Sequence, residues 1–120
     1  MKTWAVVGLG NNPQRAAFGV AKLLQDNGHR IIPVYPRAET VHGEVGYKTL
    51  SEIPGPVDVV DCFVNSTLVG KVVDEAIAIG AKAVWLQLDV IDNDAIARAQ
   101  AAGLITVMDR CPAIEYRKKS

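Results

Sequence analysis

Two glycines that follow a short apolar run could bind an anion. The run Trp4-Ala5-Val6-Val7 leads directly into Gly8-Leu9-Gly10-Asn11-Asn12-Pro13, and a helix-patterned stretch begins near Ala17. Glycines let backbone N–H groups approach a phosphate closely, and the positive end of a helix dipole favours its negative charge. The order of strand, glycine turn and helix therefore predicts a phosphate cradle of the kind that holds a nucleotide.

The turn departs from the dinucleotide fingerprint G-x-G-x-x-G at its end. Pro13 stands where the third glycine is expected, and proline has a fixed φ and no N–H. Arg15 follows at the start of the helix, where its guanidinium could pair with a pyrophosphate. The alternative is an Arg15 side chain that points into solvent.

The next apolar strand ends without the acid that NAD-binding folds use. Residues 31–34 run into Tyr35-Pro36-Arg37, where such a fold would place Asp or Glu against both ribose hydroxyls. A cation at this point suits a ribose that carries a further phosphate, so NADP and coenzyme A (CoA) both fit better than NAD. An exposed loop arginine is the competing interpretation.

Further polar side chains follow the later apolar runs. Val64 leads into Asn65 and Ser66, whose polar edges could face a base or a pantetheine amide but are also typical of helix caps. Gln87 ends another apolar run. Cys111 lies beside an arginine that could lower the thiol pKa and make it redox-active, and the alternative is a small buried side chain.

The elements that must position these residues alternate between strand and helix. Strands are predicted at 4–7, 30–34, 57–64, 82–88 and 104–108, and helices near 17–27, 68–79 and 93–102. Gly28, Gly80 and Gly103 each separate a helix from the next strand. This pattern predicts an α/β fold, with one Rossmann-like, doubly wound domain over residues 1–120. Its five-stranded parallel sheet has the expected order 3-2-1-4-5, with helices on both faces.

In such a sheet, the loops at the carboxyl ends of the strands line the ligand crevice. The candidate segments are 8–15, 35–37, 64–67, 87–90 and 109–112. The connection 35–56 is unusually long and contains only a short possible helix at 49–53. A loop of this length is typical of a functional segment or a covering lid.

The composition excludes several classes of protein. The chain has 120 residues, a hydrophobic fraction of 49% and a formal net charge of +0, so no electrostatic footprint for nucleic acid or an anionic membrane is present. No apolar run reaches membrane-spanning length, and no signal peptide is visible. Cys62 and Cys111 form neither a disulfide framework nor a metal-ligand set, which indicates a reducing, cytoplasmic compartment.

No set of residues indicates catalysis. His29 follows a helix cap at the end of the sheet opposite the crevice, and His42 has no spaced partner. Asp58 and Asp61 lie three residues apart on a strand, so their side chains are expected on opposite faces and cannot form a carboxylate pair. The sequence contains no HExxH motif and no Ser/His/Asp order that would converge on one site. An enzymatic role stays open, and a binding role is favoured.

Five sequence blocks together resemble the small bacterial CoA-binding protein family, whose fold is like the CoA-binding N-terminal domain of the succinyl-CoA synthetase alpha subunit. The blocks are Val6-Val7-Gly8-Leu9 with Asn12-Pro13-Gln14-Arg15, then Ile32-Pro33-Val34-Tyr35-Pro36, Pro56-Val57-Asp58-Val59-Val60-Asp61, Gly80-Ala81-Lys82-Ala83-Val84-Trp85-Leu86-Gln87, and Met108-Asp109-Arg110-Cys111-Pro112. The resemblance covers essentially the whole chain. It also implies departures from the family pattern at Gly10, Val64 and Asp89, where Ser, Arg and Gly are common.

The resemblance implies a ligand and its contacts. The turn 8–15 would hold the pyrophosphate of CoA, and residues 35–37 would flank the phosphorylated adenosine. Residues 64–66 would lie against adenine, and Gln87 would border the pantetheine channel. The expected cofactor-binding residues are Gly8, Leu9, Gly10, Asn12, Pro13, Arg15, Tyr35, Pro36, Arg37, Val64, Asn65, Ser66, Gln87 and Cys111.

Two functions are compatible with these residues. The first is a non-catalytic module of the cytosol that binds CoA or an acyl-CoA through its ADP part at the Gly8–Arg15 turn. The alternative is the nucleotide-binding component of an enzyme, either an NADP-dependent reductase or an acyl-CoA synthetase subunit that acts with a partner chain. The expected partner is a small nucleotide cofactor, with a homodimer or a protein partner left open and no nucleic acid or membrane expected.

Overall fold

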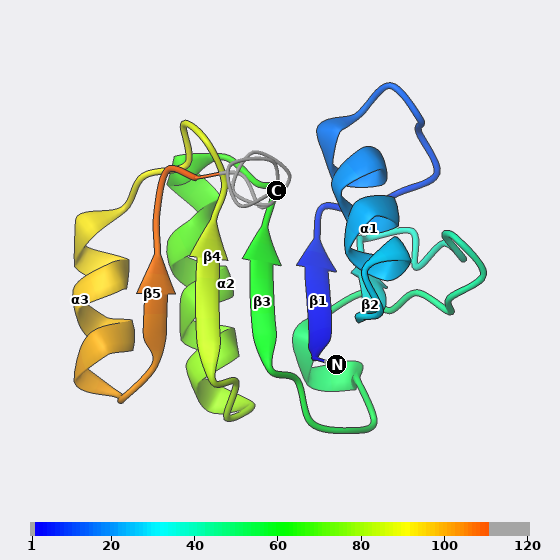
Figure 1. Ribbon diagram of the computed structural model, residues 1–120. Helices are drawn as coiled ribbons and strands as arrows, with labels where there is room; N and C mark the ends of the chain where they lie inside the picture. Colours follow the sequence, from blue (N-terminus) through cyan, green and yellow to red (C-terminus); the bar gives the residue numbers. More distant parts are fainter. Residues whose placement is uncertain (1, 111–120) are drawn as a thin grey trace.

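The computed structural model describes residues 2–110, in which strands and helices alternate along the chain (Figure 1). The strands are β1 (Thr3–Val7), β2 (Arg30–Val34), β3 (Val59–Cys62), β4 (Ala83–Leu86) and β5 (Ile105–Val107). The helices are α1 (Ala16–Asp26), α2 (Ser66–Ala78) and α3 (Asn93–Ala101), with a 3-10 helix, η1, at Leu50–Glu52. Within this part of the chain, no helix combines the length and the apolar character needed to cross a bilayer.

The five strands form one parallel sheet in the order β2-β1-β3-β4-β5. This arrangement confirms the predicted α/β, Rossmann-like fold. Val7 at the end of β1 lies opposite Val34 of β2 and Cys62 of β3, so these strands end level with one another. The loops that follow them therefore leave from the same edge of the sheet.

The strand order differs in one respect from the expected order 3-2-1-4-5, which placed the third strand outside the second. β3 pairs instead with β1, because the long connection after β2 occupies the outer edge of β2. The N–H of Tyr47 donates to the carbonyl of Pro33, and the N–H of Tyr35 donates to the carbonyl of Tyr47, both at 2.9 Å. The order along the chain consequently reverses between β1 and β3, and this reversal is where such sheets bind ligands.

Helices cover both faces of the sheet, as predicted. α1 packs on the face that carries Trp4 and Val6, whereas α2 and α3 pack on the face that carries Ala5 and Val60. Figure 1 shows α1 in front of the sheet and α2 behind it. Because both faces are covered, the strands are apolar on both sides, which is typical of a parallel sheet. Among the described strand residues, Asp61 is the buried charged exception.

The predicted glycine caps are confirmed. Gly28, Gly80 and Gly103 follow α1, α2 and α3 with φ values of +87°, +76° and +89°. A left-handed residue at this point ends a helix and turns the chain towards the next strand. Each turn starts a strand at the edge of the sheet opposite the loops that line the crevice.

Candidate nucleotide-binding site

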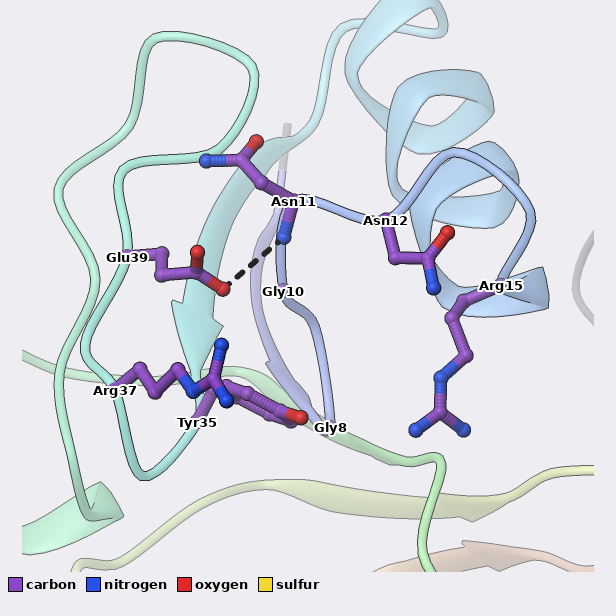
Figure 2. A pocket seen from close by; sticks show the side chains of 8 residues that line it. All are labelled: Gly8, Gly10, Asn11, Asn12, Arg15, Tyr35, Arg37 and Glu39. Atoms are coloured by element: carbon purple, nitrogen blue, oxygen red, sulfur yellow. Dashed lines mark hydrogen bonds between the residues drawn. The ribbon is translucent and has the colours of Figure 1, made fainter.

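Two adjoining cavities lie at the carboxyl edge of the sheet and share Gly8 and Arg15. The first has a volume of about 210 Å³ and is lined by Gly8, Gly10, Asn11, Asn12, Arg15, Tyr35, Arg37 and Glu39, as Figure 2 shows. The second has a volume of about 390 Å³ and is lined by Gly8, Arg15, Ala16, Ala17, Phe63, Val64, Asn65, Leu68, Gln87, Leu88 and Val90. Together they join the loops after β1, β2, β3 and β4 in one crevice.

Part of the backbone of the glycine turn lines the first cavity. The N–H of Gly8 belongs to the sheet, since it donates to the carbonyl of Val34 at 2.8 Å. Asn12 braces the turn, because its Oδ1 accepts from the N–H of Gln14 at 3.0 Å and its carbonyl accepts from the N–H of Arg15 at 3.0 Å. Between Gly8 and Asn12, which both line the first cavity, Gly10 and Asn11 line it as well.

Two arginines give the first cavity its positive charge from opposite walls. Arg15 caps the start of α1 with extended backbone, and its side chain extends below the turn in Figure 2. Arg37 and Tyr35 come from the loop after β2, on the other side of Gly8. A phosphate between these walls could accept charge-assisted hydrogen bonds from both guanidinium groups.

Glu39 is a cavity residue that the sequence reasoning missed. Its Oε1 accepts a hydrogen bond from the N–H of Asn11 at 3.3 Å, and this bond joins the loop after β2 to the glycine turn (Figure 2). The second strand is followed by the tyrosine and arginine instead of the acid of NAD-binding folds, as predicted, but an acid from the same loop reaches the cavity. Ala38 has φ +50° and donates its N–H to the carbonyl of Tyr35 at 2.8 Å, which turns the chain back towards the cavity. The available signal was that Glu39 is the first acidic residue after that strand.

A buried acid and amide underlie the second cavity. Asp61 on β3 is fully buried, and its Oδ1 accepts a hydrogen bond from Nε2 of Gln87, which lines the cavity. The Oδ2 of Asp61 is buried and has no hydrogen-bond partner. Burial raises the pKa of Asp61 to about 8, an effect that the bond from Gln87 opposes. The spacing of Asp58 and Asp61 excluded only a carboxylate pair, whereas the place of Asp61 inside an apolar strand was the available signal for its burial.

Ser66 connects two of the predicted loops. Its Oγ donates to the carbonyl of Asp89 at 3.3 Å and accepts from the N–H of Ile91 at 2.9 Å. Asp89 has φ +67°, and its N–H donates to Oδ1 of Asp109 at 2.7 Å. The Asn65 side chain makes no capping bond at α2. Ser66 therefore holds the loop after β4 in place, while Asn65 lines the second cavity.

Most of the predicted site residues converge on the two cavities. Those that line them are Gly8, Gly10, Asn12, Arg15, Tyr35, Arg37, Val64, Asn65 and Gln87. The side chain of Leu9 is fully buried in the core beneath α1, and Pro13 and Pro36 are exposed outside the lining. Cys111 lies outside the described residues. That these residues bind a cofactor stays a prediction.

The other cysteine and the possible metal ligands are also placed. Cys62 is fully buried in the core, as predicted, and burial raises the pKa of its thiol, which keeps it protonated and unreactive. Across residues 2–110, no three or more His, Cys, Asp or Glu side chains gather in a way that could hold a metal ion. The polar side chains that line the two cavities are those of two arginines, a tyrosine, a glutamate, and four asparagine or glutamine residues.

Comparison with known proteins agrees with this architecture. The sequence profile of a protein family described as CoA binding domain matches residues 2–117. The chain is 34% identical over 110 residues to the uncharacterized protein YneT of Bacillus subtilis (strain 168), which covers 92% of this chain and 82% of YneT. The structure is similar to that of a hypothetical protein from Pyrococcus horikoshii OT3, with a TM-score of 0.93, 38% identity, and coverage of 98% and 82% of the two chains.

A further similarity is to part of a much longer enzyme subunit. Over 81 residues, the chain is 36% identical to the alpha subunit of acetate–CoA ligase [ADP-forming] II from Pyrococcus furiosus. The match covers 67% of this chain and only 18% of the ligase subunit. The likeness thus concerns one segment of that subunit.

Proposed function

We propose that this chain, which belongs to the CoA binding domain family, is a module that binds CoA or an acyl-CoA without transforming it. Family membership supports CoA over the NADP alternative that the arginine after the second strand left open. The observation that carries the proposal is the first cavity, in which a glycine turn, two arginines and a tyrosine face one another. The module belongs in the cytosol, as the cysteine usage predicts.

The first cavity suits the ADP part of the ligand. Arg15 lies where the glycine turn meets α1, so its guanidinium can pair with the pyrophosphate. Tyr35 and Arg37 offer an aromatic ring and a cation to the adenosine. These contacts need no rearrangement of the sheet, because all of them come from loops at its carboxyl edge.

The second cavity suits the pantetheine arm. It continues from Gly8 and Arg15 over apolar side chains such as Val64 and Leu68. Gln87 supplies an amide at its floor, held by Asp61. A chain of methylene and amide groups matches such a lining of apolar walls with a few polar groups.

A second candidate function is that of a CoA-binding component of an acyl-CoA synthetase that acts with a partner chain. The 36% identity to the alpha subunit of an ADP-forming acetate–CoA ligase favours it. In this case, ATP and a free acid would yield a thioester only when the partner is added. A homodimer or another protein partner stays a prediction.

Replacing Arg15 with glutamine should weaken CoA binding by about ten- to a hundredfold, because a charge-assisted hydrogen bond contributes about 1.5–3 kcal/mol. Isothermal titration of the purified protein with CoA measures the effect. The matched control is Arg30→Gln, which removes the same charge at the opposite edge of the sheet, where β2 begins. Equal losses in both variants would contradict the placement of the pyrophosphate, and an absence of CoA binding by the unaltered protein would contradict the proposal itself.

A further inference from the structure

We infer that Glu39 determines specificity in the first cavity, where it favours a ribose with free hydroxyls over one that carries a phosphate. The inference rests on the proposed function, since it concerns how the protein recognises the ribose of a CoA-like ligand. Glu39 was not among the residues expected to bind a cofactor. Its effect opposes that of Arg37, which lines the same cavity.

The carboxylate of Glu39 occupies a position that an anionic ligand would otherwise use. Its Oε1 accepts from the N–H of Asn11 at 3.3 Å, and this N–H belongs to the turn that is expected to hold phosphate. Figure 2 shows the carboxylate directed across the cavity to that N–H. A phosphate bound to the N–H of Asn11 would have to displace the carboxylate or lie beside it. Two negative charges in contact repel each other.

The backbone that carries Glu39 packs closely against its neighbours. A side chain at Gly10 would place its Cβ 2.9 Å from Oε1 of Glu39, so the glycine provides the space that the carboxylate fills. A Cβ at Gly46 would lie 2.1 Å from the carbonyl oxygen of Glu39, which shows how closely the two backbones pack. Nδ2 of Asn11 donates to the carbonyl of Thr40 at 2.5 Å, and this bond ties the turn to the same segment. These contacts hold the backbone around Glu39 close to the glycine turn, within reach of the N–H of Asn11.

A carboxylate and an arginine after the second strand select opposite ligands. In βαβ nucleotide-binding folds, an acid at this place accepts from ribose hydroxyls, whereas an arginine accommodates a ribose phosphate. An ionised carboxylate only accepts hydrogen bonds, so it stabilises a hydroxyl and repels a phosphate. This cavity contains both groups, and their effects on a 3′-phosphate should nearly cancel.

The test compares CoA with dephospho-CoA, which lacks only the 3′-phosphate, by isothermal titration. The unaltered protein should bind the two with dissociation constants within about threefold of each other. In Glu39→Gln the neutral amide no longer repels phosphate, and the preference should shift towards CoA by about tenfold or more. Glu39→Ala should shift it in the same direction, and thermal unfolding checks that both variants are folded.

The matched control is Glu52→Gln in η1, which removes one negative charge from an exposed residue outside the cavities and should leave the ratio unchanged. If both ligands bind and the ratio is the same in Glu39→Gln as in the unaltered protein, the inference is overturned while the proposed function stands. If neither ligand binds to the unaltered protein, the proposed function fails and the inference fails with it.

Discussion

Alanine at position 8 is expected to destabilise the protein by about 3–4 kcal/mol. Gly8 has φ +99°, and a Cβ there would lie 2.4 Å from the carbonyl oxygen of Phe63. The backbone cannot easily move away, since the N–H of Gly8 donates to Val34 at 2.8 Å and the N–H of Phe63 donates to Val7 at 2.9 Å. Urea unfolding, followed by the fluorescence of Trp4 and Trp85, measures the change in the free energy of unfolding.

Gly28→Ala is the matched control for this prediction. Gly28 has a similar φ of +87°, but nothing lies within 4 Å of a Cβ built on it. Gly28→Ala should therefore lower the free energy of unfolding only by the cost of a left-handed alanine backbone, about 1–2 kcal/mol. Equal losses in the two variants would mean that the close approach of β1 and β3 at Gly8 is not the constraint, and the turn would then be less rigid than the structure indicates.

The unaltered protein should lose about 1.5–2 kcal/mol of stability between pH 6.5 and pH 8 because of Asp61. Burial raises the pKa of this carboxyl group to about 8 in the folded state, from an ordinary value of 3.8. The folded protein thus keeps the proton after the unfolded chain has lost it. Each pH unit between about 4 and 8 then destabilises the fold by about 1.4 kcal/mol, and above pH 8 the loss stops growing.

Asp61→Asn should remove most of this dependence, because the amide resembles the protonated acid and does not titrate. Its stability should exceed that of the unaltered protein at pH 8 and approach it at acid pH. Urea midpoints across this range test the prediction, and His29, whose pKa is lowered by burial, affects both proteins equally and cancels in the comparison. A parallel decline in both proteins would show that Asp61 is already ionised in the folded state.

The same buried group bears on the second cavity. Asp61 contacts Gln87, whose amide lines the proposed path of the pantetheine arm. Polar groups with unsatisfied atoms are rarely buried without a reason, since each one destabilises the fold. The stability that Asp61→Asn regains at pH 8 would therefore measure how much an ionisable carboxyl group beneath this cavity destabilises the fold.

The sequence by itself determined the fold class and the edge of the sheet at which the site forms. Apolar strands that alternate with amphipathic helices can bury their surfaces only as a parallel sheet between helices. Because parallel strands end at one edge, the segments after them had to meet. Gly8, Arg15, Tyr35 and Arg37 could accordingly be expected in one crevice from local patterns alone, and they line the first cavity.

Only the tertiary structure decided the features that depend on contacts between distant segments. The pairing of Tyr47 with β2 excluded β3 from that edge and set the strand order. The turn after β2 brought Glu39 to Asn11, 28 residues away in sequence, and the pairing of β3 with β4 brought Gln87 to Asp61, 26 residues away. Periodicity and turn chemistry report on neighbours a few residues apart, whereas these contacts follow from how whole elements share the edges and faces of one sheet.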